Sequence, residues 1–209
     1  MNGRFITLEG IEGAGKSTLA RVVGEYLESQ GLSVLLTREP GGTALAERLR
    51  QIVLERGGEP VPAVAETLVM FAARALHVEN LIRPALARGT WVVCDRFTDA
   101  TRAYQGAGRG VDRELIEALA RAVQGPLTPD CTLLLDLPVS AGLARARARS
   151  GADSDRFEAE AIAFFERVRA GYLAVAQADP QRVSLIDASE PEAQVRAAVL
   201  GVIAQLVPR

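Results

Sequence analysis

Five short apolar runs recur along the chain, separated by longer stretches with helical periodicity. The runs are almost continuously hydrophobic, whereas strands with one solvated face alternate hydrophobic and polar positions. This pattern predicts strands that helices cover on both faces, as in a parallel sheet. The predicted strands are Phe5 to Leu8, Val34 to Thr37, Trp91 to Asp95, Cys131 to Leu137 and Val183 to Asp187.

The segments between the runs predict helices. In the first, apolar residues recur three and four positions apart from Leu19 to Leu27, and Gly31 marks its expected end. Strands alternating with helices predict an α/β fold with an open, doubly wound parallel sheet, whose ligands gather at the carboxyl ends of the strands. The remaining helices are predicted at 43–56, 63–87, 112–124, 139–149, 156–177 and 190–206.

The length and composition predict one compact domain. The chain has 209 residues, 48% of them hydrophobic, which is ample for a buried core. We expect a single domain over residues 1–209, because no linker, repeat or low-complexity tract divides it. A polar, glycine-containing break at Ser150 to Asp155 interrupts an otherwise helical stretch.

Charge and cysteine usage exclude several classes of protein. The net charge of −2 argues against a nucleic-acid-binding role, which usually requires a basic excess. Cys94 and Cys131 lie in apolar runs without a C-x-x-C pair, so we expect buried thiols rather than metal ligands or a disulfide. The N-terminus enters a strand without a signal region, and no apolar stretch approaches the length of a membrane span. We therefore expect a cytoplasmic protein that does not bind membranes.

The strongest motif follows the first predicted strand. Gly10 to Ser17 match G-x-x-x-x-G-K-[ST] immediately before the first predicted helix. In such a P-loop, backbone N–H groups bind phosphate, the lysine reaches the outer phosphates and the hydroxyl ligates Mg²⁺. The motif predicts a nucleoside triphosphate site. The residues expected there are Gly10, Ile11, Glu12, Gly13, Ala14, Gly15, Lys16, Ser17 and Thr18.

Further charged residues lie at the ends of other predicted strands. Arg38 offers a bidentate guanidinium to phosphate, although alone it could equally be a solvated turn residue. Four apolar residues precede Asp95, which is the form of a Walker B strand, and Arg96 follows directly. Asp136 competes for the Walker B role. We favour Asp95, because Arg96 places a cation beside it, and interpret Asp136 as a structural cap before Pro138.

In order and spacing, these motifs resemble the bacterial thymidylate kinase family. The P-loop alone specifies only a superfamily, whereas R-E-P-G-G-T together with D-R-F and A-Y-Q-G is specific to this family. The resemblance covers essentially the whole chain. Its segments are Glu9 to Thr18, Arg38 to Thr43, Phe71 to Arg74, Asp95 to Phe97 and Ala103 to Gly110.

The resemblance implies a fold and a reaction. The fold would be of the P-loop NTPase type with a small lid segment, and the enzyme would be a homodimer. The reaction would transfer the γ-phosphoryl group of ATP to dTMP, giving ADP and dTDP for dTTP biosynthesis, with Mg²⁺ required. Ser17 and Asp95 would organise the metal, while Arg38 and Arg96 would bind the dTMP phosphate.

The resemblance also implies an acceptor pocket. Phe71 would stack on thymine and Arg74 would donate to a base carbonyl, a spacing of three that suits one helix face. From the residues alone, Phe71 is more often a core residue, and His77 on the same predicted helix is more often packed or solvated than catalytic. Tyr104 would pack on the deoxyribose and disfavour a 2′-hydroxyl. Further substrate contacts are expected from Glu9, Thr101 and Gln105.

The catalytic cation is expected from a lid at approximately 145–157. Phosphoryl transfer needs alignment and charge neutralisation more than a strong base. The variable P-loop positions 11–14 contain no basic residue. Arg149 and Arg156 flank the glycine-containing break and are the lid residues predicted to be catalytic, whereas we interpret Arg145 and Arg147 as a solvated helix face.

Two other functions stay open at this point. A P-loop kinase for another nucleotide or nucleoside would use the same scaffold with a few different pocket residues. A nucleotide-driven switch is less favoured, because the chain contains no Asn-Lys-x-Asp sequence and because Arg38 and Arg96 indicate a second anionic ligand. The apolar helices between 63 and 124 are where a dimer interface is expected.

Overall fold

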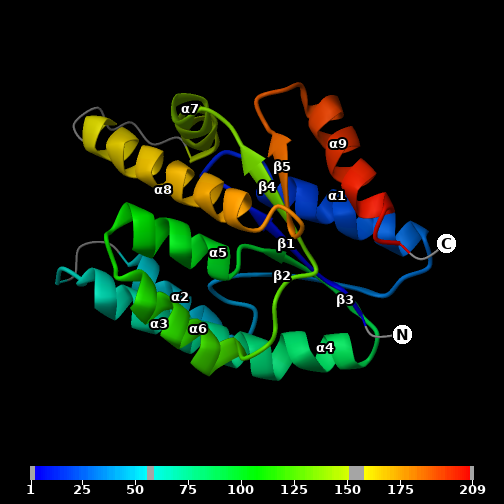
Figure 1. Ribbon diagram of the computed structural model, residues 1–209, viewed down its shortest axis with the longest axis horizontal. Helices are drawn as coiled ribbons and strands as arrows, with labels where there is room; N and C mark the ends of the chain where they lie inside the picture. Colours follow the sequence, from blue (N-terminus) through cyan, green and yellow to red (C-terminus); the bar gives the residue numbers. More distant parts are fainter. Residues whose placement is uncertain (1–2, 56–58, 151–157, 208–209) are drawn as a thin grey trace.

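A parallel sheet with helices on both faces forms the centre of the computed structural model, which describes residues 3–55, 59–150 and 158–207 (Figure 1). The strand order is β2-β3-β1-β4-β5, and each neighbouring pair is parallel. All five predicted strands are confirmed. They are β1 (Phe5–Glu9), β2 (Val34–Arg38), β3 (Trp91–Asp95), β4 (Cys131–Asp136) and β5 (Val183–Asp187).

The predicted helices are also present. The predicted helix over 63–87 is one continuous run in which a π-helical segment joins two α-helices. Thr43 caps α2, its Oγ1 accepting a hydrogen bond from the Ala46 N–H. The helices are α1 (Lys16–Ser29), α2 (Ala44–Leu54), α3 (Ala63–His77), η1 (Val78–Ile82), α4 (Arg83–Ala87), α6 (Arg113–Gln124), α7 (Val139–Ser150), α8 (Glu158–Ala178) and α9 (Glu192–Ala204).

One helical stretch was not predicted. It consists of α5 (Thr98–Thr101) and the π-helical η2 (Arg102–Gly108). Glycines at positions 106 and 108 lower the helix propensity of this segment. Tertiary packing on α8 outweighs that propensity. The two helices lie so close that a Cβ atom at Gly108 would be only 2.7 Å from the ring of Phe164 on α8. The glycine therefore allows η2 to approach α8 closely.

Alternate residues of β3 pack on opposite faces of the sheet. Val93 belongs to the core cluster that α1, α8 and α9 cover, whereas Val92 and Cys94 pack with Val78 of η1 on the other face. Burial on both faces explains why the strands are continuously hydrophobic. Both cysteines are buried free thiols, as predicted, and burial raises the pKa of Cys131 to about 11.

The helices within the described ranges include none that is long and apolar enough to cross a bilayer.

Candidate active site at the carboxyl edge of the sheet

The P-loop and the residues that follow β2 and β3 meet in one cleft of about 460 Å³ at the carboxyl edge of the sheet. This confirms that the fold brings most of the predicted residues together. Asp136, the competing Walker B candidate, does not line the cleft, and its carboxylate forms a bidentate ion pair with Arg169, at 2.7 and 2.8 Å. It is therefore a partner of α8, rather than the helix cap that we predicted. The lining includes Glu12, Gly13, Gly15, Lys16, Ser17, Thr18, Arg38, Asp95, Arg96, Tyr104 and Gln105.

The P-loop lysine turns back onto its own loop. Lys16 Nζ donates to the Ile11 carbonyl at 2.7 Å, and the side chain is buried. Burial, reinforced by the nearby Arg96, lowers the pKa of Lys16 to about 7. A bound polyphosphate would favour the charged form of this lysine.

Ser17 and Asp95 are in direct contact at the start of α1. Ser17 Oγ donates to Asp95 Oδ2 at 2.5 Å. The described residues contain no cluster of three or more acidic, histidine or cysteine side chains that could hold a metal by themselves. A hydroxyl and one carboxylate suit Mg²⁺, which is commonly bound by one or two carboxylates together with substrate phosphates.

Arg96 lies at the centre of the cleft. Its backbone has a left-handed φ of 72°, and its guanidinium donates to the hydroxyls of Tyr172 at 3.0 Å and Tyr104 at 2.9 Å. Glu12 of the P-loop pairs with Arg96 at 3.2 Å and accepts from the Tyr104 hydroxyl at 2.7 Å. The acidic loop residue therefore faces the Arg96 side of the cleft, where its charge is paired.

Glu9 lies behind this cluster and is fully buried. Its carboxyl oxygens accept from the Phe97 N–H at 2.7 Å and from the Tyr172 hydroxyl at 2.8 Å. Burial, with a contribution from Asp99, raises the pKa of Glu9 to about 8. The Tyr172 hydroxyl therefore links Glu9 to Arg96 by two hydrogen bonds.

Two arginines line the opposite wall. Arg38 is mostly exposed and pairs with Glu47 at 3.2 Å. Arg50 on α2 donates to the Pro40 carbonyl at 2.8 Å and faces the same cleft. Arg50 was not predicted, because no motif marks it and a cation on a helix is ordinarily solvated.

Phe71 and Arg74 are buried beneath the cleft and are not part of its lining. The Arg74 guanidinium stacks on the Phe71 ring, 4.8 Å from its centroid. Its Nε donates to Glu39 Oε2 at 2.7 Å, and its Nη2 donates to the Phe97 carbonyl and to Thr101 Oγ1. Nη1 is buried without a hydrogen-bond partner among the described residues.

Gln105 holds the second buried polar atom that lacks a partner within the described ranges, its Oε1. Its Nε2 donates to Glu66 Oε1 at 2.7 Å, and Glu66 also pairs with Arg109 at 3.1 Å. Because a carboxylate only accepts, Glu66 holds the amide nitrogen toward itself and leaves Oε1 free. Buried polar atoms without partners are costly, so the Arg74 donor and the Gln105 acceptor each indicate a place for a polar ligand group.

The predicted lid residues cannot be placed in this cleft. Arg156 lies outside the described residues, and so does the side chain of Arg149. Arg145, interpreted above as part of a solvated face, is exposed, and it also donates to the Ala188 carbonyl at 2.9 Å. It lines a hollow of about 370 Å³ on the other side of the P-loop, together with Gly13 and Thr18.

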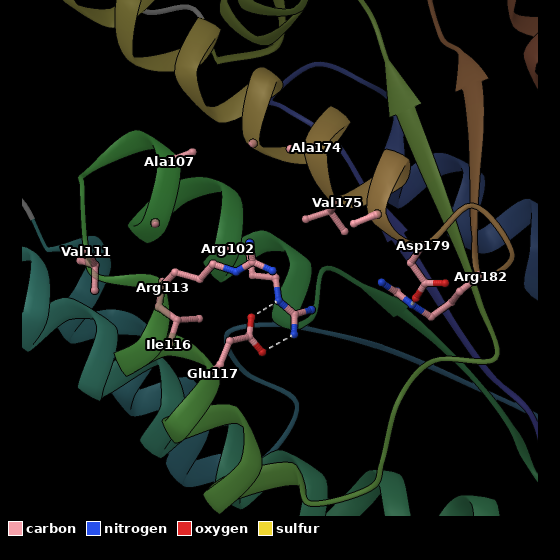
Figure 2. Close-up of a pocket in the computed structure, with 13 residues that line it drawn as sticks. Arg102, Ala107, Val111, Arg113, Ile116, Glu117, Ala174, Val175, Asp179 and Arg182 are labelled. Atoms are coloured by element: carbon pink, nitrogen blue, oxygen red, sulfur yellow. Dashed lines mark hydrogen bonds and ion pairs between the residues drawn. The ribbon is translucent and has the colours of Figure 1, made fainter.

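A separate hollow of about 520 Å³ lies between η2, α6 and α8 (Figure 2). Arg102 extends across it to form a bidentate bond with Glu117, and it also pairs with Asp99 at 2.7 Å. Arg182 binds the other oxygen of Asp99 at 2.7 Å. Arg102 thus ties η2 to α6 and faces away from the P-loop cleft.

The family model, two relatives and a solved structure that match this chain all carry the name thymidylate kinase. The family model "Thymidylate kinase" matches residues 8–199. Thymidylate kinase from Teredinibacter turnerae is 58% identical over 196 residues, covering 94% of this chain and 95% of the relative. The enzyme of that name from Pseudomonas fluorescens Pf-5 is 56% identical over 209 residues, covering 100% and 99%. The crystal structure of thymidylate kinase from Ehrlichia chaffeensis superposes with a TM-score of 0.79 at 33% identity, covering 99% of this chain and all of that one.

Proposed function

The chain belongs to the thymidylate kinase family, whose members transfer a phosphoryl group from ATP to dTMP, and we propose that the cleft at the carboxyl edge of its sheet carries out this reaction. Donor and acceptor would meet between the P-loop and Arg96. Sequence identity above one half over nearly the full length supports the activity.

The donor site is built around the P-loop. Lys16 and the loop amides would bind the outer phosphates of ATP, and the hollow beside Arg145 has room for the rest of the nucleotide. Ser17 and Asp95, which already touch, would hold Mg²⁺. When bound, the ion neutralises phosphate charge.

The observation that carries the acceptor assignment is the pair of unpartnered buried atoms. Thymine presents a carbonyl oxygen beside an N–H group, and these complement the free Nη1 donor of Arg74 and the free Oε1 acceptor of Gln105. Cytosine presents the reverse pattern, an amino donor beside a ring acceptor. It would oppose donor to donor and acceptor to acceptor, so the pair favours thymine.

Arginines and tyrosines would hold the rest of dTMP. Arg96 and Arg38 offer guanidinium groups to the phosphate on two sides of the cleft. Tyr104, fixed by Glu12 and Arg96, would pack on the sugar and leave no room for a 2′-hydroxyl. Once the γ-phosphate of ATP and the phosphate of dTMP are aligned, transfer of the γ-phosphoryl group requires positive charge around that group. Arg149 and Arg156 would supply it from the lid over 145–157, within a single domain spanning 1–209.

We infer a homodimer in the cytoplasm. Large apolar side chains on α2 and α3 and between them are about half exposed, and covering them would favour association. They are Leu45, Ile52, Leu54, Val61, Val64 and Leu68.

An acceptor screen tests the proposed function. Purified protein with ATP and Mg²⁺ is offered dTMP, dUMP, dCMP, dGMP, thymidine and no acceptor, and ADP release is measured. We expect dTMP to give the highest kcat/KM, no turnover without acceptor, and loss of most turnover in Lys16→Ala with the fold intact by circular dichroism. A better acceptor than dTMP, or near-native activity of Lys16→Ala, would contradict the assignment.

A further inference from the structure

Behind the acceptor pocket, four side chains form a continuous hydrogen-bonded row that runs from β2 into α3. Glu39 lies at its centre and is 3% exposed. One of its oxygens accepts from Arg74 Nε at 2.7 Å, and the other is bonded to His77 Nδ1 at 2.9 Å. The far nitrogen of the His77 ring bonds to the Thr37 hydroxyl at 2.7 Å. His77 is fully buried and is not part of the cleft lining.

The direction of these hydrogen bonds is determined by chemistry. A carboxylate only accepts, so His77 Nδ1 carries the proton that it shares with Glu39. In the neutral imidazole, Nε2 is then an acceptor, and the Thr37 hydroxyl donates to it. The bond to Glu39 thus fixes the tautomer of the neutral ring, and the contact with Thr37 fixes its tilt, as outer-shell partners do for histidines at metal sites.

The loop after β2 is shaped around this ring. Gly42 has a φ of 88°, which few other residues adopt, and a Cβ atom at this position would overlap the His77 ring and the Thr37 hydroxyl. The second glycine of the R-E-P-G-G-T motif therefore makes space for the imidazole. His77 is thus an integrated part of the loop that carries Glu39.

The row leaves Arg74 a single orientation. Glu39 holds Nε, while Phe97 and Thr101 hold Nη2, and the guanidinium is planar, so the direction of Nη1 follows. The Glu39 carboxylate is held in turn by His77 at its other oxygen. Without that bond, the carboxylate could rotate and Arg74 would lose its alignment.

We propose that His77 is a positioning residue for recognition of the base. It touches no substrate, but through Glu39 it aims the free N–H groups of Arg74 at the base carbonyl. Discrimination between thymine and cytosine should therefore depend on a side chain that lies outside the pocket. This inference rests on the proposed role of Arg74 as the residue that recognises the base.

A pair of isosteric variants isolates the hydrogen bond. His77→Asn places an amide nitrogen near the position of Nδ1 and keeps the donor to Glu39, whereas His77→Leu has nearly the same shape without a donor. For each variant, kcat and KM are measured with dTMP and with dCMP, and the ratio of the two kcat/KM values is compared. Thermal unfolding is monitored in parallel, so that changes in stability are separated from changes in recognition.

We expect His77→Leu to lower the dTMP to dCMP ratio about ten- to a hundredfold, the range that loss of an outer hydrogen-bond partner costs at metal sites. His77→Asn should retain the ratio within about threefold. The loss should appear mainly in KM for dTMP, because the groups that bind phosphate are untouched. A purely structural role would change the unfolding temperature and weaken both acceptors equally, and an unchanged ratio in His77→Leu would overturn the inference.

Two further variants keep the test decisive. If His77→Leu does not fold, His77→Gln is used in its place. The longer glutamine side chain reaches toward Thr37 and lacks the donor to Glu39. An unchanged dTMP to dCMP ratio in His77→Gln would also overturn the inference. Arg74→Ala separates this inference from the proposed function. If Arg74→Ala alters the ratio and the His77 variants do not, only the positioning role fails; if Arg74→Ala has no effect, the base-recognition role on which the inference rests fails, and the inference with it.

Discussion

Glu9 is the residue whose environment departs most from that of a free carboxyl. It is fully buried, contacts Tyr172 and the Phe97 backbone, and has a pKa raised from 4.5 to about 8. The sequence placed Glu9 at the end of a strand beside the P-loop. It could not reveal Tyr172 as a partner, because the two residues are 163 positions apart in the chain.

This environment predicts a pH dependence of stability. Between the unfolded pKa of 4.5 and the folded pKa of about 8, the folded state keeps a proton that the unfolded chain has released. The free energy of unfolding should therefore fall as pH rises, by about 1.4 kcal/mol per pH unit from this group. Glu9→Gln removes this contribution.

Urea unfolding of parent and Glu9→Gln between pH 5 and 6.5 tests this dependence. The window lies below the pKa of Lys16, about 7, where that group is mostly protonated in both states and adds little slope. We expect the stability of the parent to decline more steeply than that of the variant. Parallel pH profiles would show that Glu9 is ionised in the folded protein.

At the scale of elements, hydrophobic patterning predicted the strands well and the connections poorly. A strand that is buried on both faces must be apolar throughout, so the ends of each apolar run in the sequence mark the ends of a strand. The η2 segment has no such pattern, since it mixes glycines, alanines and polar residues, and its helical form depends on packing against α8. Arg145 is exposed, as predicted, but the sequence could not show that it bonds to the Ala188 carbonyl, which lies 43 positions away.

The proposed lid arginines lead to a kinetic prediction. Arg156→Ala should reduce kcat much more than it weakens dTMP binding, because in the proposed function this cation is delivered by a closing lid and acts on the transition state. In other phosphoryl-transfer enzymes, such an arginine contributes about 10³ to 10⁵ in turnover. Combining it with Arg149→Ala should be worse than either change alone.

Steady-state kinetics of the two single variants and the double variant measure this effect. Arg121→Ala, an exposed change on α6, is the matched control and should leave kcat unaltered. If the double variant keeps kcat within a few-fold of the parent, then Arg38, Arg96 or the metal must supply the charge instead.

At the scale of the whole molecule, the sheet converts separate motifs into one site. The P-loop, Arg38 and Arg96 could be assigned to a common edge from sequence, because parallel strands all end there. The partners that orient them could not be assigned. Glu39 and His77 meet although they lie 38 positions apart, and the orientation of Gln105 depends on Glu66 of a different helix. Such pairings follow from tertiary distance, which periodicity and motifs do not encode.

In the proposed function, Arg74 of α3 and Gln105 of η2 recognise the edge of the thymine base. The most direct test is the ratio of kcat/KM for dTMP to that for dCMP in the parent and in Arg74→Ala, with Arg88→Ala on an exposed helix end as the matched control. We expect the ratio to fall at least about tenfold in Arg74→Ala, because the unfavourable donor opposition to cytosine disappears together with the bond to thymine. The ratio should be unchanged in Arg88→Ala. An active Arg74→Ala variant that retains the parent's ratio would contradict the claim.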